Sequence, residues 1–588
     1  MFFRKIISWY LKNRVKKTVA FVLFLVVFVN FFHGRYNKPD GVIQWDIKSY
    51  YAYLPATFIY KDLSLQFRQD NLKKFGDLIW PIETPIGKKA IITTMGMSIL
   101  YTPFFLVAHT VALLTLYEAD GYSIPYKFAL TFSALFYFWL GLHFLIKILR
   151  KHFEEKVIAF TILGIGLGTN LFYYTTYEAP MTHAYNFALI TAFIWLTIRF
   201  YENPSIKRIL LSGTLAGLIT LIRPTNIIVL LIFFLWNIKS WNCIKSRFSF
   251  FIKHFHWILI MAGAFILIWI PQFIYWYNVS GTLFYFSYGE AGGSFFFNNP
   301  QIFNILFSYK KGWLVYTPIM IFSLGGLILL PKRLPGSLTS ILTFTIFNIY
   351  ILASWWSWWF GGGFGLRAFI DSYGILAIPF ACFVDFSYNL KYKWKRIVIF
   401  SVLTLLIGFN QFQTRQYVNA AIHWWWMNKE AYWETFLKLR PTERFWEVVT
   451  LPDYDAARKG IYREIKPKVT NKTSNVSEWK HITEESLLEW LSLKIKNDTA
   501  YFETLNKLLR LNTDTLEVIR TLAQEKIMEK GFDFWNRKMG IELLVKEIKG
   551  KPDLLKQIEE KANKKNNPLD SQVLYDAIWI YNREMKKK

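Results

Sequence analysis

The aromatic segment 42–55 contains one acidic residue, Asp46, between Trp45 and Ile47. A carboxylate can take a proton from a hydroxyl or an amine as that group attacks another molecule, which is general-base chemistry. A helix cap or a surface charge is the alternative role. Because Asp46 lies a few residues after the first long apolar run of the chain, we take it as the candidate catalytic residue.

Two later segments carry basic residues that suit an anionic group. Lys310 and Lys311 precede Gly-Trp at an expected helix end, and Arg367 follows a run of tryptophans and glycines. Glycines allow close approach of the backbone, and an arginine can bind two phosphate oxygens at once. These residues predict a phosphate site in which Asp371 orients Arg367. A plain i,i+4 ion pair between Arg367 and Asp371 is the alternative.

Three further residues are weaker candidates for the same site. Glu178 is an acid in the segment 173–186, and His183 follows it closely. A histidine at this place can bind a phosphate or a hydroxyl, or it can be a satisfied residue at the membrane interface. Arg223 lies at an expected hairpin turn, Arg-Pro-Thr-Asn, and is a further candidate for phosphate binding.

The composition predicts an integral membrane protein. Hydrophobic residues make up 53% of the 588 residues and aromatic residues 19%, against about 45 to 50% apolar residues in soluble domains. The net charge of +28 does not indicate nucleic acid as a partner, because the basic residues recur between apolar runs, as the positive-inside rule requires. Cys243 and Cys382 form no pattern of paired or metal-binding thiols.

The apolar runs predict a topology. Basic residues precede the run 18–32 and no cleavage site follows it, so we expect an uncleaved signal anchor with a cytoplasmic amino terminus. Residues 33–89 then face outward. Further crossings are expected at 126–149, 157–173, 184–200, 209–222, 227–236, 257–277, 313–330, 340–353, 374–386 and 397–412.

The basic connectors between these runs constrain the run 93–117. Connectors 147–156, 206–208, 239–253, 331–333 and 391–396 can all be cytoplasmic only if 93–117 does not cross the membrane. We expect 93–117 to lie along the outer interface or to dip in and return. An ordinary crossing with one misassigned connector is the alternative.

Four outward segments then meet at one face: 33–89, 173–186, 279–312 and 354–373. They carry the polar residues that the predicted membrane helices lack. The helices from Ala184 onward contain almost no Asp or Glu. Ion-driven transporters usually bury such residues as coupling sites, so this pattern disfavours transport.

This arrangement resembles the GT-C superfamily of integral-membrane glycosyltransferases, which includes protein O-mannosyltransferases and lipid A aminoarabinose transferases. The resemblance covers roughly 21–412 and rests on the architecture, on Trp45-Asp46 and on the aromatic run that follows. In the family an Asp in the first external loop acts as the base or orients the acceptor, and Asp46 matches that place. The chain departs from the family pattern at the second acid, because Glu178 lies too early for a simple match and His183 lies near the expected place.

The resemblance implies inverting transfer of a sugar from a polyprenyl-phosphate donor. Such a reaction needs one carboxylate to accept the acceptor's proton while the phosphate leaves from the opposite face. Tyr50 and Tyr51 can stack on the sugar or anchor the loop in the headgroup layer. No cofactor is expected, and a divalent metal ion stays open. The acceptor, whether lipid, glycan or protein, and the sugar are not identified by the sequence.

The composition changes after residue 412. Residues 413–588 are rich in Lys, Glu and Leu with helical periodicity, and the stretch 466–477 is typical of a linker. We therefore expect a glycosyltransferase-like membrane module at 1–412, with an external loop at 33–92, and a soluble helical external region at 413–588.

The sequence thus predicts an all-α, GT-C-like membrane bundle of about 11 to 13 helices. We expect it in a bacterial cytoplasmic (inner) membrane, surrounded by membrane lipids, with its active face and carboxyl-terminal region in the periplasm. A lipid-linked glycan transporter or flippase is the non-enzymatic alternative. A glycan polymerase or ligase is the alternative enzymatic function.

Overall fold

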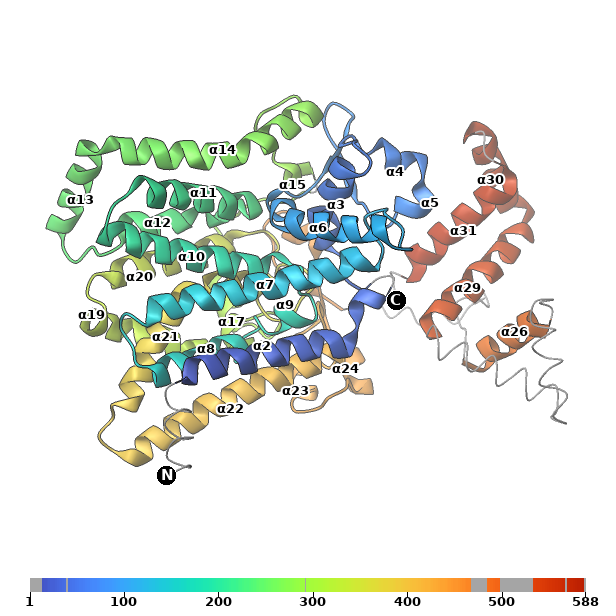
Figure 1. Cartoon of the computed structure of the whole chain (residues 1–588). Helices are drawn as coiled ribbons and strands as arrows, with labels where there is room; N and C mark the ends of the chain where they lie inside the picture. Colours follow the sequence, from blue (N-terminus) through green and yellow to red (C-terminus); the bar gives the residue numbers. More distant parts are fainter. Residues whose placement is uncertain are drawn as a thin grey trace. The chain divides into compact units, whose positions relative to one another are not determined.

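The computed structural model describes residues 13–38, 41–290, 292–466, 484–496, 532–565 and 568–585. The chain divides into two compact units, Met1–Pro467 and Lys468–Lys588. Both are helical, and the strands of the described residues form two short antiparallel pairs (Figure 1). The predicted all-α class is confirmed. Residues 413–466, which the sequence groups with the carboxyl-terminal region, belong to the first unit.

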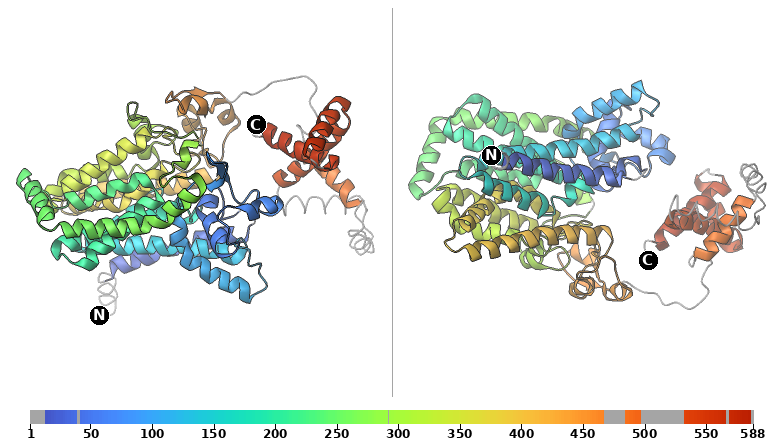
Figure 2. Two further views of the ribbon diagram at one scale, coloured as in Figure 1. Left: turned by 90° about the horizontal axis from the view of Figure 1, so that it is seen from above. Right: turned by 60° about the horizontal axis from the view of Figure 1, so that its bottom comes forward.

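The first unit is a bundle of apolar helices that run side by side (Figures 1 and 2). Eight helices in the described part are long and apolar enough to cross a membrane. They contain α2 (Arg14–His33, within the span 14–37), α6 (Gly96–Leu114), α7 (Ile124–Leu149), α10 (Thr182–Glu202), α14 (Phe255–Ser280), α20 (Ser337–Ser354), α21 (Tyr373–Tyr388, within the span 367–388) and α22 (Lys393–Val418). The predicted polytopic bundle is therefore confirmed.

The burial of these helices separates the centre of the bundle from its rim. The most apolar windows of α10 and of 367–388 are 83% and 89% buried, whereas those of α2, α14 and α22 are each 22% buried. A helix that is apolar all round but mostly uncovered by protein suits contact with lipid. The candidate site residues on α10 and before α21 are thus held by the best-packed part of the bundle.

Four predicted crossings consist of shorter helices. They are made by α8 (Glu155–Leu167), by α11 (Ile206–Ile222), by η2 (Pro224–Ile228) with α12 (Val229–Leu235), and by α17 (Trp313–Tyr316) with α18 (Met320–Gly326). Pro318 lies between α17 and α18 and has no backbone N–H for a helical hydrogen bond. Hydropathy does not reveal such breaks, so the candidate spans are fewer than the sequence predicts.

The basic connectors lie at one end of the bundle, as predicted. Figure 1 shows α13 (Trp241–Lys253) and α19 (Leu330–Arg333) together at the left. Ion pairs of Lys151 with Glu202 and of Arg333 with Asp385 tie the ends of α7, α10, α19 and α21 together there. After the predicted topology, we name this the inner end, and the opposite end, which carries α3 (Asp46–Phe58) and α15 (Ser287–Glu290), the outer end.

Helix α6 packs along α7, as Phe104 against Phe136 shows, and it also has contacts at the outer end. Near its start, Ser98 donates a hydrogen bond to the Tyr50 carbonyl. Glu118, which lies four residues after the end of α6, forms an ion pair with Lys74 at 2.9 Å. The start of α6 and the residues just after its end therefore both contact the segment 41–92. This arrangement favours the prediction that 93–117 does not cross, although α6 is long and apolar enough to do so.

Short elements complete the outer end. They are η1 (Arg35–Asn37), α4 (Gln66–Asp70), α5 (Leu72–Phe75), the hairpin of β1 (Pro81–Glu83) with β2 (Lys89–Ile91), α9 (Tyr173–Thr176), α16 (Ile302–Phe307), η4 (Arg367–Ser372), α23 (Lys429–Glu434), α24 (Glu443–Val448), α25 (Tyr454–Ala457), and the pair of β3 (Leu451–Pro452) with β4 (Glu464–Ile465). The remaining 3₁₀ turn, η3 (Leu327–Leu329), follows α18.

The second unit contains α26 (Glu484–Lys496), α29 (Phe532–Lys549), α30 (Pro552–Lys565) and α31 (Leu569–Met585). Its apolar core is small and includes Leu544, Ile548, Ile558, Val573 and Ala577. The helical character predicted for this region is confirmed. Apart from Lys466, the predicted linker 466–477 lies outside the described residues.

Candidate active site

Asp46 is the first residue of α3. The N-cap residue is Trp45, which has a φ of 50° and makes no side-chain capping bond. A non-glycine residue in this region costs about 1 to 3 kcal/mol, so the surrounding structure must hold it. The Trp45 ring meets Trp80 edge-to-face at 6.4 Å. Asp46 is thus presented by a strained junction, and it is not the cap of the helix.

The Asp46 carboxylate forms an ion pair with Arg367. Its Oδ2 accepts a hydrogen bond from Nη2 of Arg367 at 2.9 Å, across a separation of 321 residues. The Asp46 side chain is 43% exposed, whereas the Arg367 side chain is only 16% exposed. The two residues that the sequence singles out for different reasons therefore meet at one place.

The glycine run before Arg367 lets the backbone pack closely. The Tyr174 hydroxyl accepts a hydrogen bond from the Phe364 amide at 3.0 Å. A Cβ atom on Gly363 would lie 2.5 Å from that hydroxyl oxygen. Lys311 donates a hydrogen bond to the Gly363 carbonyl. The run is therefore pinned from two sides, and its position fixes that of Arg367.

Asp371 does not orient Arg367, contrary to the prediction. Its Oδ2 accepts hydrogen bonds from Arg223 at 3.0 Å, Asn186 at 2.9 Å and Asn226 at 2.9 Å. The reason is that η4 is a 3₁₀ helix with three residues per turn, so residues i and i+4 do not share a face. The alternative i,i+4 ion pair is excluded by the same geometry.

His183 and Arg223 both belong to the surroundings of Asp371. The His183 Nδ1 atom lies 3.5 Å from Oδ1 of Asp371, and its ring packs edge-to-face on Tyr174 at 4.6 Å. The His183 side chain is fully buried. Arg223 remains partly exposed and has further N–H groups beyond the one that meets Asp371. Arg223 can therefore reach a ligand, whereas His183 lies buried beside Asp371 and forms no hydrogen bond with it.

Glu178 lies beside the loop that carries Asp46. The Tyr173 hydroxyl donates a hydrogen bond to its carboxylate at 3.1 Å. Glu178, Gln44 and Trp45 line one small pocket. Burial raises the pKa of Glu178, and the positive charges of nearby Arg367 and Arg35 oppose that rise. The structure thus brings this second acid near Asp46.

The two predicted tyrosines have different environments. The Tyr51 hydroxyl donates to the Gly121 carbonyl, and its ring packs on Tyr122, so it belongs to the core. Burial and the charge of Asp46 raise the pKa of Tyr50. Partial burial and the charge of Asp46 also raise the pKa of Tyr288, which is 39% exposed. Tyr288 is a residue of the site that the sequence did not single out, because no local pattern marks it.

The two adjacent lysines also separate. Lys311 is buried beneath Gly363, and burial followed by the charge of Arg367 lowers its pKa. Lys310 instead forms an ion pair with Glu464 at 3.2 Å and donates to the Trp425 carbonyl at 3.3 Å. Burial lowers the pKa of Lys310 as well. Lys311 therefore supports the Arg367 segment, and Lys310 belongs to a different surface.

The predicted site residues therefore form two guanidinium–carboxylate pairs at the outer end. One joins Arg367 to Asp46 and the other joins Arg223 to Asp371. Each guanidinium has five N–H donors and uses some of them on its carboxylate. Within the described residues, no group of three or more His, Cys, Asp and Glu side chains could hold a metal ion.

Comparisons with known proteins give matches to solved structures. No protein-family model and no curated protein matches the chain. The archaeal oligosaccharyltransferase AglB from Archaeoglobus fulgidus, in complex with an inhibitory peptide and a dolichol-phosphate, is similar with a TM-score of 0.44 and 10% identity over 85% of this chain. The apo form of the oligosaccharyltransferase from that organism gives a TM-score of 0.39 and 11% identity. The chain spans 60% of the length of both, and at these values neither similarity bears on function.

Proposed function

We propose that the chain is an integral-membrane glycosyltransferase that moves a sugar from a polyprenyl-phosphate donor to an acceptor with inversion. The observation that carries the proposal is the ion pair between Asp46 and Arg367 at the outer end of the bundle. It joins a partly exposed carboxylate, which can accept a proton, to a cation that can hold a phosphate. The resemblance to the GT-C superfamily supports the same reaction.

In this proposal Arg367 and Arg223 bind the donor phosphate. A guanidinium binds phosphate oxygens through two parallel hydrogen bonds. Arg223 is fixed by Asp371, which three donors hold, and Arg367 is fixed by the pinned glycine run. A phosphate that binds Arg367 competes with Asp46 for the same N–H groups. Donor binding therefore frees the Asp46 carboxylate.

The freed carboxylate then acts as the base. An oxygen or nitrogen of the acceptor attacks the anomeric carbon, and its proton moves to Asp46. The bond from that carbon to the phosphate oxygen breaks on the opposite face, and the polyprenyl phosphate leaves with both electrons. Arg367 and Arg223 stabilise the charge that develops on the phosphate. One carboxylate suffices, because no covalent enzyme intermediate forms.

The donor's polyprenyl chain lies in the lipid in this proposal, beside a bundle whose peripheral helices are mostly uncovered by protein. We propose that the outer end faces the periplasm of a bacterium with its inner membrane around the bundle. Four polar or charged residues gather at the outer end, which favours transfer over a flippase. They are Asp46, Glu178, Arg223 and Arg367. A donor that carries a chain of sugars would make the enzyme a polymerase or a ligase.

The first prediction tests Asp46. Asp46→Asn keeps the size of the side chain but removes its basicity, and general-base assistance contributes about 10² to 10⁴-fold to a rate. We expect transfer to fall by that factor, while the purified protein still binds donor. Transfer is measured with a radiolabelled polyprenyl-phosphate sugar and membrane extract as the acceptor source. Asp62→Asn, in the same outer segment, is the matched control, because Asp62 bonds only to its own loop. Activity of Asp46→Asn within threefold of the parent contradicts the role.

A further inference from the structure

Helix α13 (Trp241–Lys253) lies across the inner end of the bundle. In Figure 1 its axis crosses the direction of α11 and α14, which run along the bundle. All residues of α13 are described, and none of them is buried. Arg247 fastens the helix, because its guanidinium donates a hydrogen bond to the Trp236 carbonyl at 2.8 Å and lies over the Tyr201 ring at 3.8 Å. Since the candidate spans set the direction of crossing, α13 lies in the plane of the membrane.

The helical period divides α13 into three sides. One side faces the bundle, where Phe251 meets Phe234 at 5.6 Å. The second side consists of large apolar residues that the bundle leaves exposed: Trp241, Ile244, Phe248 and Ile252. These residues are three or four positions apart, so they share one face. The third side is polar and also exposed: Asn242, Lys245, Ser249 and Lys253.

The apolar side of α13 leads into a surface that suits lipid. Phe255 and Leu259, at the start of α14, follow α13 directly along the chain and are also exposed. The most apolar window of α14 is only 22% buried, so most of this helix is free to contact acyl chains. Large exposed apolar patches mark interaction sites. The patch on α13 therefore continues, at the inner end, a face that already meets the bilayer.

Positive charge accompanies this patch. Between Glu202 and Glu290 the chain has seven Lys and Arg residues and no Asp or Glu. Three of the lysines are exposed on α13 or just before it: Lys239, Lys245 and Lys253. The acids that other segments bring to the inner end pair elsewhere, Glu202 with Lys151 and Asp385 with Arg333. The charge of α13 is therefore open to an anionic partner from outside the chain.

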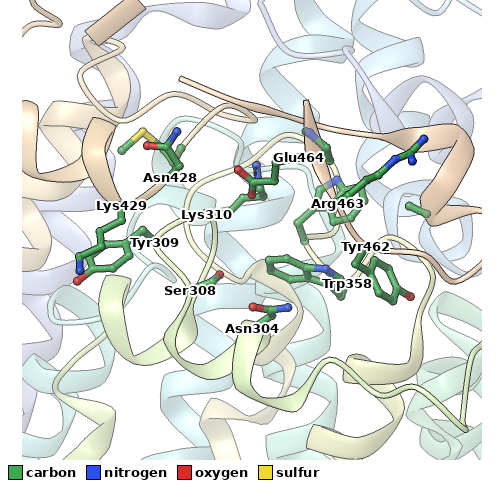
Figure 3. Close-up of a pocket in the computed structure, with 14 residues that line it drawn as sticks. Asn304, Ser308, Tyr309, Lys310, Trp358, Asn428, Lys429, Tyr462, Arg463 and Glu464 are labelled. Atoms are coloured by element: carbon green, nitrogen blue, oxygen red, sulfur yellow. Dashed lines mark ion pairs between the residues drawn. The ribbon is translucent and has the colours of Figure 1, made fainter. Parts of the chain in front are cut away.

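The cations of the outer end have different surroundings. Figure 3 shows Lys310 beside Glu464, at 3.2 Å, in the wall of a cavity of about 430 Å³. Arg463 of the same wall forms an ion pair with Asp453 at 2.7 Å. The outer end thus neutralises several of its own cations. An apolar side next to unneutralised lysines distinguishes α13 from these surfaces.

We propose that α13 lies in the headgroup layer of the leaflet at the inner end and binds anionic phospholipids there. Its apolar side enters the boundary between headgroups and acyl chains, and its lysines bind lipid phosphates. A soluble protein partner fits less well, because the apolar side leads into surface that lies within the bilayer. The inference goes beyond the proposed function, since α13 lies at the opposite end of the bundle from Asp46.

The first test measures the depth of α13 in the full chain in lipid nanodiscs. In a background without Cys243 and Cys382, the variants Phe248→Cys and Ser249→Cys each carry a nitrobenzoxadiazole probe. The two positions are a matched pair, because they are neighbours on the apolar and the polar side and both are exposed. We expect spin-labelled lipid to quench the probe at 248 about threefold more strongly than the probe at 249, as for a helix in the interface.

The second test measures the charge preference with the probe at 248. We expect spin-labelled phosphatidylglycerol to be enriched about fivefold over spin-labelled phosphatidylcholine beside it, since one basic residue near an anionic surface contributes about that factor. One triple variant replaces the lysines of α13 and its flank with glutamine: Lys239, Lys245 and Lys253. The control replaces three exposed lysines of the outer end, one of them labelled in Figure 3: Lys61, Lys429 and Lys459.

Each result bears on the proposal. Quenching that is strong at 248, weak at 249, selective for phosphatidylglycerol and lost only in the α13 triple variant supports it. Equal quenching at both positions overturns it, and weak quenching at both would assign the apolar side to a soluble partner. A lipid preference that is absent, or that survives in the α13 triple variant, also overturns it. Asp46→Asn should change neither readout, so a failure of the proposed function leaves this inference standing.

Discussion

At the scale of single residues, the two arginine–carboxylate pairs differ in exposure. The Asp371 side chain is 4% exposed and three donors surround it, whereas the Asp46 side chain is 43% exposed and meets Arg367. Loss of one partner of a buried pair costs about 3 to 5 kcal/mol. A fully exposed pair contributes about 0 to 1 kcal/mol, and the Asp46–Arg367 pair lies between these two cases, because its carboxylate is partly exposed and its guanidinium is 16% exposed. In the proposed function, Asp371 therefore stays bound to Arg223 and holds it in place for the donor phosphate, whereas the Asp46–Arg367 pair opens for that ligand.

The second prediction concerns Arg367. Arg367→Ala should weaken donor binding at least tenfold, and Arg367→Lys should recover only part of it, because a point charge replaces a planar fork. Binding of a fluorescent polyprenyl-phosphate sugar in nanodiscs gives the affinities. Arg333→Ala is the control, since Arg333 also forms an ion pair, with Asp385, but at the inner end. Equal donor affinity in the parent and in both Arg367 variants would leave Arg367 with a structural role only.

At the scale of elements, the sequence predicted the parts of the site better than their pairing. The aromatic segment with Asp46 and the glycine run with Arg367 stood out because their composition is unusual. The partner of Arg367 did not, because it depends on η4 being a 3₁₀ helix, which only the packed bundle determines. Tyr288 was missed for a similar reason, since its place beside Asp46 comes from how the segment 279–312 folds back.

The third prediction tests the glycine run as an element. Gly363→Ala places a Cβ atom 2.5 Å from the Tyr174 hydroxyl, so the run must shift and Arg367 with it. We expect the free energy of unfolding to fall by about 1 to 3 kcal/mol, as overpacking usually costs. Donor affinity should fall as well. Thermal unfolding and the donor-binding assay measure the two effects.

Two further variants make this prediction specific. Gly325→Ala, in α18, is the matched control, because a Cβ atom there meets nothing within 4 Å. Adding Tyr174→Phe to Gly363→Ala removes the clashing hydroxyl and should restore part of the donor affinity. If Gly363→Ala binds donor as the parent does, the glycine run does not position Arg367.

At the scale of the whole molecule, the sequence predicted which connectors lie together, and the inner end confirms it. It could not predict the breaks that shorten α8 and divide α17 from α18, because a proline or glycine ends a helix only in a particular backbone context. The boundary of the first compact unit also lies beyond the end of the apolar runs. Residues 419–466 follow the last long helix and pack on the outer end, as the bond between Trp359 and Tyr454 shows.

The last prediction tests whether α6 crosses the membrane. In a background without Cys243 and Cys382, single cysteines at Asn37, Glu118 and Lys151 should report their side through a membrane-impermeant thiol reagent. We expect Asn37 and Glu118 to label from the same, outer side, because Lys74 of the outer segment binds Glu118 at 2.9 Å. The cysteine that replaces Lys151 should label only after the membrane is permeabilised, because Lys151 binds Glu202 at the inner end. Labelling of Glu118 only from the side of Lys151 would make α6 a true crossing. The segment 41–92 could not then contact both the start of α6 and the residues just after its end, and Asp46 and Tyr50 would need a different support.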